Sequence, residues 1–589
     1  MMKPAIHAFV YVLAALFFGQ TALAESALVT AIKTGDPDSV NLVIRQGADV
    51  NAPEKDGTNP LQWAVYQDNA DIVAALLNTG ADASQPNREG MTPLILAAQA
   101  GNADIARRLL DAGAAVNQTL LNGETPLMMA ARTGDLETLQ ILLDRGAAIN
   151  ARENLRGTTA IMWAAANRNA DAIRLLLDNG AEIRRNSGTM PAGSGPYLAP
   201  TARERIWDFY HGGGLVGDSL ENSEDVSSDE NLEIRVSRAE LVSRLPESLV
   251  QDFMENPGSD LPAEFLLLMP PVGGKDWGGL SALHFAVREG DLASVRVLVE
   301  AGADINQLSE FGWTPLLTAT QNRYYQIGKY LLDHGANPNI ANEGGWNPLY
   351  IATDNRNIEA GDYPTRKPDM DHLAFIRLLL DHGADPNLRM ASSTETRTIF
   401  THQWLREEGA TPFLRAAQSS DLTLMKLLLE YGADPFIPTS HGVTPLMVAA
   451  GIGWVEGVTF EWSESANEET LRLLLELGLD PNLQDSEDHR TALMGAAHKG
   501  RNYAIQILAD AGADFALRDI GSRDSIHLLS GTTWQAIDYA EGLVRVGVQS
   551  AESHSETSAL IRQLMLERGL EVPPEGRTLD SICVVDICK

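Results

Sequence analysis

The sequence predicts an all-α solenoid of about twelve helix-turn-helix repeats, joined by β-hairpin loops and broken by several insertions. One observation is that the triplet Thr-Pro-Leu recurs at fixed phase. It begins at Thr92, Thr125, Thr314 and Thr444, with a Thr-Pro-Phe variant at Thr411. A second observation is a Gly about 21 residues after each start, followed by the next start 12 residues later. A period of 33 residues is typical of stacked helical repeats.

Each part of one unit has a physical reason. Thr92 can cap a first helix with its hydroxyl, and Pro93 suits the first helical position, where no N–H is needed. Small residues follow in that helix and allow close approach of its neighbours. The larger apolar residues of Ile105 to Leu110 predict a second helix, which Gly113 ends in the left-handed conformation. One unit cannot bury its own apolar faces, so stacking must make the core.

These motifs resemble the ankyrin repeat, and the resemblance covers most of residues 26–572 apart from the insertions. It implies a fold of paired helices and a role in protein binding, with no catalytic residues and no cofactor. The family's Thr-Pro-Leu-His is kept only at Ser281–His284, because other repeats place residues such as Met128 and Leu317 at the His position. We interpret those replacements as packing residues.

The amino-acid composition argues against several classes of function. The 589 residues carry 45 Lys+Arg against 79 Asp+Glu, a net charge of −34. This balance argues against a nucleic-acid-binding protein and against docking on an anionic membrane, since both need clustered cations. The only cysteines are Cys583 and Cys588, which excludes a disulfide-rich scaffold and a Cys-based metal centre. In an exported chain these two could form a local disulfide.

The first 24 residues predict a secretory signal peptide. Lys3 gives a positive start, His7 to Phe18 is almost entirely apolar, and Ala22-Leu23-Ala24 matches a cleavage site. The apolar run is too short to span a bilayer as a stable helix. We therefore expect a periplasmic or secreted protein, soluble after cleavage near Ala24 and not inserted in the membrane. The alternative is a cytosolic protein with an apolar N-terminus.

Spacing locates the insertions. Gly180 to Ser281 is 101 residues instead of 12, so a long excursion replaces one hairpin. Three more insertions fall between the two helices of the eighth, tenth and twelfth repeats, in Asn357–Asp371, Gly453–Asn467 and Glu541–Glu556. Because repeats two apart are roughly 20 Å apart, loops of this length could meet. The predicted composite surface would present Tyr363, Trp454, Phe460 and Trp462; the alternative is three independent loops.

A second candidate contact site lies on the hairpins. Trp313 and Trp346 share one repeat position, with Phe311 and Trp277 nearby, and Tyr350 occupies the former His position. Exposed aromatic residues dominate binding hot spots. The alternative is that each Trp packs on the next hairpin.

Two strings in the long insertion imitate hydrolase motifs, His211-Gly212-Gly213-Gly214 and Gly217-Asp218-Ser219-Leu220. Ser219 enters an acidic, Ser-rich stretch, and no G-x-S-x-G is present, so we do not predict an enzyme. Alternating acidic residues at 225–231 lack the Gly and Glu of a calcium loop, so we predict no metal site.

The sequence thus predicts five segments: a signal peptide (1–24), repeats 1–5 (25–185), a partly flexible insertion (186–277), repeats 6–12 with loop insertions (278–572) and a tail with the cysteine pair (573–589). The function we predict is a non-catalytic scaffold in the cell envelope that presents the hairpin tips, the first-helix face and the inserted loops to a protein partner. A small-molecule or glycan receptor formed by the loops of repeats 8, 10 and 12 is the alternative. The chain also resembles exported bacterial ankyrin proteins, some of which support envelope redox enzymes, and this implies such an enzyme as one possible partner.

Overall fold

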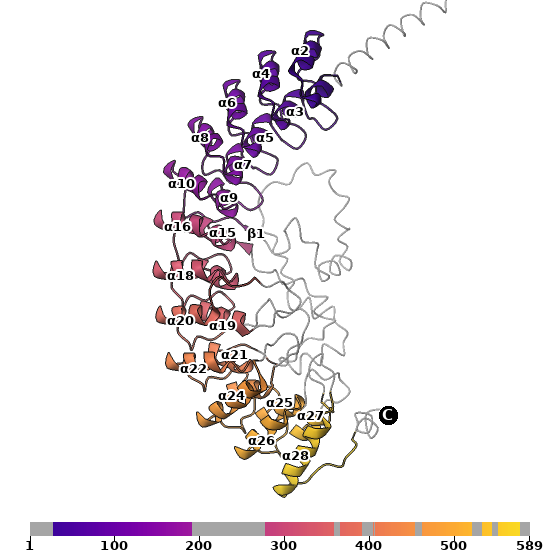
Figure 1. The fold of residues 1–589 in the computed structure, drawn as a ribbon, viewed down its shortest axis with the longest axis vertical. Helices are drawn as coiled ribbons and strands as arrows, with labels where there is room; N and C mark the ends of the chain where they lie inside the picture. The colour runs from indigo at the N-terminus through magenta and orange to yellow at the C-terminus, as the bar shows by residue number, and fades with distance from the viewer. Residues whose placement is uncertain are drawn as a thin grey trace, which may run out of the picture. The chain divides into compact units, whose positions relative to one another are not determined.

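A computed structural model describes residues 27–190, 277–357, 366–391, 405, 407–453, 462–520, 533–544 and 552–577. The chain divides into two compact units, residues 1–188 together with 279–589, and residues 189–278. Twelve helix pairs stack in the first unit, which confirms the predicted all-α solenoid (Figure 1). In the second unit, the described residues form two short antiparallel strands, β1 (Thr189–Met190) and β2 (Trp277–Gly278).

The first helices of the repeats pack side by side in one layer. They are residues 27–34, α3 (Pro60–Tyr66), α5 (Pro93–Ala100), α7 (Pro126–Thr133), α9 (Ala160–Ala166), α15 (Ala282–Arg288), α17 (Pro315–Gln321), α19 (Pro348–Asn357), α21 (Pro412–Gln418), α23 (Pro445–Ala450), α25 (Ala492–His498) and α27 (Ala536–Ala540). The Thr92 hydroxyl caps α5 as predicted, since its Oγ1 accepts from Ile95 N at 3.2 Å, and Thr125, Thr314, Thr411, Thr444 and Thr491 cap their helices in the same way.

The second helices form the other layer. They are α2 (Pro37–Arg45), α4 (Ala70–Asn78), α6 (Ala103–Asp111), α8 (Leu136–Asp144), α10 (Ala170–Asp178), α16 (Leu292–Glu300), α18 (Tyr325–Asp333), α20 (His372–Asp381), α22 (Leu422–Glu430), α24 (Glu464–Glu476), α26 (Asn502–Asp510) and α28 (Ser555–Glu567). The glycine after each has a positive φ, as at Gly335 with φ 94°, which a glycine adopts without strain.

A ladder of asparagine amides joins successive hairpin loops. Asn482 donates to Gly512 O at 3.1 Å and accepts from Asp514 N at 2.7 Å. The same pair of bonds links each repeat to the next at six further asparagines: Asn51, Asn117, Asn150, Asn306, Asn339 and Asn387. Each amide satisfies a helix-end carbonyl and a loop N–H, so the ladder fixes the spacing between repeats.

The array is continuous across the long excursion. Helix α9 packs on α15 and α10 on α16, as neighbouring repeats do elsewhere. On the hairpin, Asn186 bridges Ser281, and Gly279 N donates to Gly188 O at 3.4 Å. The chain therefore leaves and re-enters the stack at adjacent positions.

The other insertions lengthen helices as well as loops. Helices α24 and α28 have 13 residues, where most second helices have nine. Helix α19 has ten residues, where its neighbours α17 and α21 have seven. The inserted segments thus begin and end on helices that belong to the stack.

The closed base of the excursion generates a prediction. A variant in which an Asn-Gly turn replaces residues 189–278 should keep the helical stack, because residues 188 and 279 are already hydrogen-bonded neighbours. We expect the helical circular dichroism per repeat and the urea midpoint to be close to those of the full chain. Loss of the cooperative transition would show that the two halves do not stack on each other.

Candidate protein-interaction face

One residue position of the first helices forms a row of large apolar side chains. The position lies four residues after the N-cap, and repeats 2 to 6 fill it with Trp63, Leu96, Met129, Trp163 and Phe285, which we call the inner stripe. Trp63, Leu96 and Trp163 are half-buried, whereas Met129 and Phe285 are buried. Because the five helices pack side by side, the row is continuous through repeats 2 to 6.

Trp63 is held in a fixed orientation. Its indole N–H donates to Glu54 Oε2 at 2.6 Å, and Lys33 Nζ lies 3.8 Å from the ring centroid. Tyr66 meets the indole edge-on at 5.9 Å between centroids and is 70 % exposed. An aromatic side chain held in place loses little conformational entropy on binding, so this end of the inner stripe is suited to contact a partner.

Trp163, in the first helix of repeat 5, is also held in a fixed orientation. Its indole N–H donates to Thr158 Oγ1 at 2.8 Å, and that hydroxyl donates in turn to Glu153 Oε1 at 2.8 Å. Glu153 is buried, and burial raises its pKa, but hydrogen bonds from the backbone of Thr158 and Arg156 outweigh this and lower the pKa overall. The ionised carboxylate thus organises the hairpin beside Trp163.

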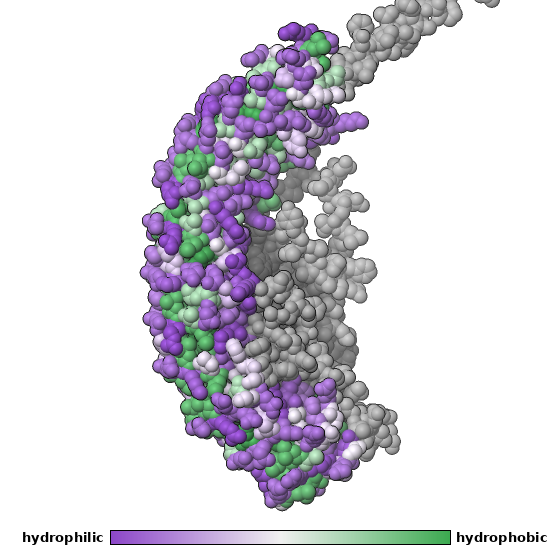
Figure 2. Space-filling model, in the orientation of Figure 1, coloured by the Kyte–Doolittle hydropathy of each residue, from purple (hydrophilic) through white to green (hydrophobic). Residues whose placement is uncertain are grey.

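The hairpin tips add two exposed leucines to the same repeats. Leu121 is 76 % exposed and Leu155 is 50 % exposed, each four residues before the N-cap of its repeat. On the face shown in the space-filling view, hydrophobic residues appear in groups between hydrophilic ones (Figure 2). Leu121 and Leu155 thus add exposed apolar groups to the half-buried residues of the inner stripe.

Sequence reasoning overlooked the inner stripe. The sequence features that indicated a contact surface were the aromatic residues of the later hairpins. The position just before the stripe residue, where the family's His is lost, was interpreted only as a packing position. Aligning Asn59, Thr92, Thr125, Thr159 and Ser281 as cap residues would have placed Trp63 and Trp163 in one column.

The aromatic residues predicted to form an exposed patch on the hairpins differ in their burial. Trp346 is 6 % exposed and Tyr350 is 1 % exposed, so both pack inside the stack, which corrects the expectation that they belong to an exposed patch. Trp346 forms a cluster with Leu317 and Ile351, and Trp313 packs against it half-buried. Phe311 is half-buried, and its carbonyl accepts from Glu343 N of the next hairpin. Trp277 lies in β2, and its side chain is outside the described residues.

Two of the three inter-helix insertions meet, as predicted for the composite surface. Trp462, which precedes α24, donates its indole N–H to Asn357 Oδ1 at the end of α19, at 3.0 Å. The guanidinium of Arg356 lies 4.3 Å from the centroid of the Trp462 ring and pairs with Asp421 at 2.6 Å. Repeats 8 and 10 are thus joined across repeat 9.

Buried polar groups of repeat 9 support this contact. Arg415 is buried and donates to Asp354 Oδ1 and to Asn357 O, each at 2.8 Å. Gln418 Nε2 donates to Gly453 O at 2.9 Å, where the tenth-repeat insertion begins. Because each buried donor has an acceptor, the junction is ordered without a ligand.

The third insertion contacts a different repeat. His554, just before α28, bonds to His498 O of α25 at 3.0 Å, and its neighbour Glu552 lies against Gly542. The hydrogen bonds of its described residues are to repeats 11 and 12. Tyr363, Trp454, Phe460, Cys583 and Cys588 lie outside the described residues, as do the hydrolase-like strings at 211–220.

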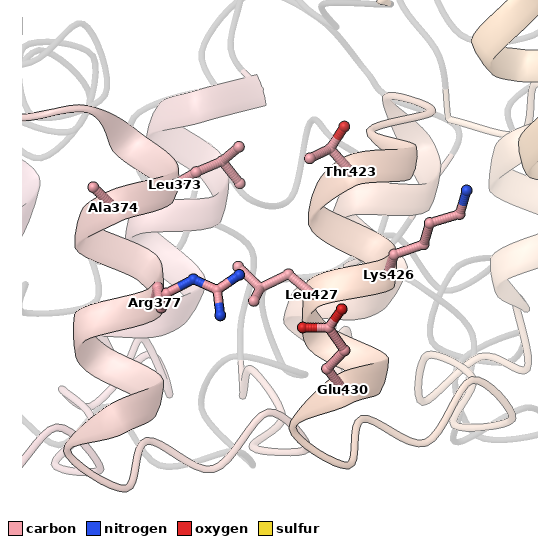
Figure 3. Close-up of a pocket in the computed structure, with 7 residues that line it drawn as sticks. All are labelled: Leu373, Ala374, Arg377, Thr423, Lys426, Leu427 and Glu430. Carbon is pink, nitrogen blue, oxygen red and sulfur yellow. The ribbon is translucent and has the colours of Figure 1, made fainter.

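A groove opens between α20 and α22. Phe375 of α20 packs where Gly328 of α18 lacks a side chain and stacks on Tyr325 at 4.3 Å between centroids, so α20 leans towards α18. The space left beside α22 is about 480 Å³, and Leu427 lies on its floor (Figure 3). Arg377 points across the groove towards α22, where Glu430 lies, while Lys426 points away. Because both basic and acidic side chains line the groove, its charge favours neither an anionic nor a cationic ligand.

Within the described ranges, no group of three His, Cys, Asp or Glu side chains is arranged to hold a metal ion. In the same part of the chain, no helix is long and apolar enough to cross a lipid bilayer.

Family models identify the repeat. A model of three consecutive ankyrin repeats matches residues 28–120, 109–187 and 283–390, and a single ankyrin-repeat model matches residues 408–440. Together these matches cover just over half of the chain. The chain belongs to the ankyrin-repeat family. Ankyrin repeats form a protein-binding architecture and are typically non-catalytic, which favours a protein partner for this ankyrin stack.

Two curated relatives share a short stretch with this ankyrin protein. Protein phosphatase 1 regulatory subunit 27 from Homo sapiens and from Mus musculus are each 52 % identical over 54 residues. The stretch is 9 % of this chain and 35 % of each relative, so the chain spans about a third of the length of these relatives. The similarity therefore covers only a short part of either protein.

The contact between repeats 8 and 10 generates a prediction. Replacing Trp462→Ala removes a hydrogen bond and a cation–π contact and should destabilise the C-terminal half by about 1–2 kcal/mol. Trp462→Phe keeps a ring over Arg356 and should lose roughly half of that. Urea unfolding followed by circular dichroism measures both. Midpoints equal to the wild type for both variants would contradict the contact.

Proposed function

We propose that this ankyrin protein is a non-catalytic scaffold that binds a protein partner through the inner stripe and the tip leucines of repeats 2 to 6. The single observation that supports it is the run of apolar side chains on one face, held in place by hydrogen bonds at both Trp63 and Trp163. Such a row matches the anchors found at protein interfaces, where a few aromatic residues carry most of the binding energy.

The proposed mechanism follows from the ladder and the stack. Each repeat presents one apolar side chain at a fixed register, so a partner meets several anchors at once without reorganising the scaffold. Pre-ordered surfaces bind with a smaller entropic cost than loops that must fold on contact. The insertions of repeats 8 and 10 are an additional surface for the same partner, since Trp462 is 42 % exposed at their junction.

Affinity capture tests the scaffold function. Baits would be the wild type, a stripe variant (Trp63→Ala with Trp163→Ala) and a control variant that truncates the exposed Phe436 and Leu566 instead. We expect a protein captured by the wild type and by the control, and lost by the stripe variant, because only the stripe variant removes the anchors. Equal capture by all three baits would place the binding surface elsewhere.

The location we propose is outside the cytoplasm, in the cell envelope. It is supported by the apolar segment and the small-x-small pattern of residues 7–24. An envelope redox enzyme is a partner class that the resemblance to exported bacterial ankyrin proteins suggests.

Export has a direct test. N-terminal sequencing of the protein from its native source should give Glu25 as the first residue, and Ala24→Arg should block that cleavage because the site needs a small residue. A chain that begins at the initiator Met in native cells would contradict export while leaving the scaffold proposal standing.

A further inference from the structure

Three consecutive repeats each place an arginine beside the inner stripe. Arg132, Arg168 and Arg288 lie at the C-terminal ends of α7, α9 and α15 or just beyond, and all three are exposed. Arg132 and Arg288 lie one helical turn from Met129 and Phe285, and the Arg288 guanidinium is 5.0 Å from the Phe285 ring centroid. Residues one turn apart share a helix face, so cations and apolar groups alternate there.

The hairpin beside Trp163 adds two more cations. Arg152 and Arg156 are exposed on the loop whose tip is Leu155. Arg152 also donates to Asn186 O at 2.9 Å, which holds it against the next repeat. Arg152 and Arg156 thus join Arg132, Arg168 and Arg288 as exposed arginines on the first-helix side of repeats 4 to 6, on a chain whose net charge is −34.

Several carboxylates lie near these arginines, and the Glu124 carboxylate interacts electrostatically with Arg132. Glu153 accepts N–H bonds from Leu155, Arg156 and Thr158. Asp135 caps α8 through Thr138 N, and Glu289 pairs with Arg288 at 3.2 Å. Among the described residues, no ion pair joins Arg132 or Arg168 to a carboxylate.

The second-helix layer carries its own arginines. Arg107 of repeat 3 pairs with Glu137 at 2.7 Å, and Arg174 of repeat 5 pairs with Asp171 at 2.7 Å. The guanidinium of Arg296 in α16 lies 5.0 Å from the centroid of the Tyr330 ring. These three arginines lie on the other layer and therefore serve as a comparison for those on the inner-stripe side.

We propose that the inner-stripe side of repeats 4 to 6 binds an acidic, amphipathic segment of its partner, with apolar side chains on the half-buried Trp163 and the exposed Leu121 and Leu155, and carboxylates on the flanking arginines. This partner class rests on the proposed scaffold function. Guanidinium groups pair with carboxylates through two hydrogen bonds, which fixes the register of such a segment. A nucleic acid is disfavoured because the remaining charge of the protein repels a polyanion and the exposed leucines offer nothing to phosphates.

Binding to a synthetic probe tests this directly. The full chain would be titrated with a fluorescent peptide in which Glu alternates with Leu and Phe. A peptide with Lys in place of Glu, a poly-glutamate peptide without apolar residues and a DNA duplex serve as comparisons. We expect binding of the Glu-Leu-Phe peptide alone, weakened by salt because exposed charges contribute to it.

A matched pair of triple variants separates local from global charge. Reversing Arg132→Glu, Arg168→Glu and Arg288→Glu should weaken binding of the Glu-Leu-Phe peptide about tenfold or more. Reversing Arg107→Glu, Arg174→Glu and Arg296→Glu on the second-helix layer changes the net charge equally and should leave binding within about twofold of the wild type, since these groups lie on the other layer.

The Glu changes remove cations from helix C-terminal ends, which can weaken folding. A triple Gln variant of Arg132, Arg168 and Arg288 keeps the fold with less risk and should still weaken binding several-fold, with an unchanged urea midpoint. Equal effects of the two reversed triples, or stronger binding of DNA or of the Lys peptide, would overturn the acidic-segment proposal.

The outcome also distinguishes this proposal from the scaffold function. If the stripe variant loses its captured partner while all arginine variants retain it, the scaffold function stands and the acidic partner class fails. If neither set of variants affects capture, both proposals fail.

Discussion

The asparagine ladder between hairpin loops is the interaction on which the rest of the structure depends. Each amide satisfies a helix-end carbonyl of the following repeat and a loop N–H beyond it, as Asn482 does with Gly512 and Asp514. A solenoid has contacts only between neighbours, so its geometry is the sum of identical local steps. An error in one step would misplace every later repeat, and two bonds from one side chain fix each step.

The ladder also explains why this array tolerates insertions. Asn339 and Asn387 make the same two bonds as the other amides, although 44 and 45 residues separate them from their glycine partners, where uninterrupted repeats have 29 or 30. For Asn339 the extra residues lie between α19 and α20, the two helices of one repeat, and for Asn387 they lie in the connection between α20 and α21. Loop length has only a weak effect on the entropy of closure. The inserted segments can therefore vary while the repeat spacing remains constant.

Because the spacing between repeats is constant, side chains at the same repeat position lie next to one another and form a continuous surface. A single half-buried Trp would be unremarkable, but five apolar side chains at one register lie in one row because their helices pack side by side. Trp63 and Trp163 are further fixed through Glu54 and Thr158. The later repeats differ because they contain a buried polar junction. There, hydrogen bonds of Arg415 and its neighbours connect the insertions of repeats 8 and 10. The protein thus combines an apolar face in its first half with a polar junction in its second.

The sequence by itself determined the repeat, the helix caps and the positions of the insertions, because these depend on local chemistry: Thr and Pro at a helix start and Gly at its end act within a few residues. The repeat spacing also led to the prediction that all three inter-helix insertions could meet, and the contact of Trp462 with Asn357 joins two of them. The sequence did not determine which aromatic residues are exposed. Trp346 and Trp63 both lie near the start of a first helix, yet Trp346 is buried against Leu317 of the preceding repeat while Trp63 is only half-buried. Only the tertiary structure decided this, because exposure depends on what the neighbouring repeat places against a side chain.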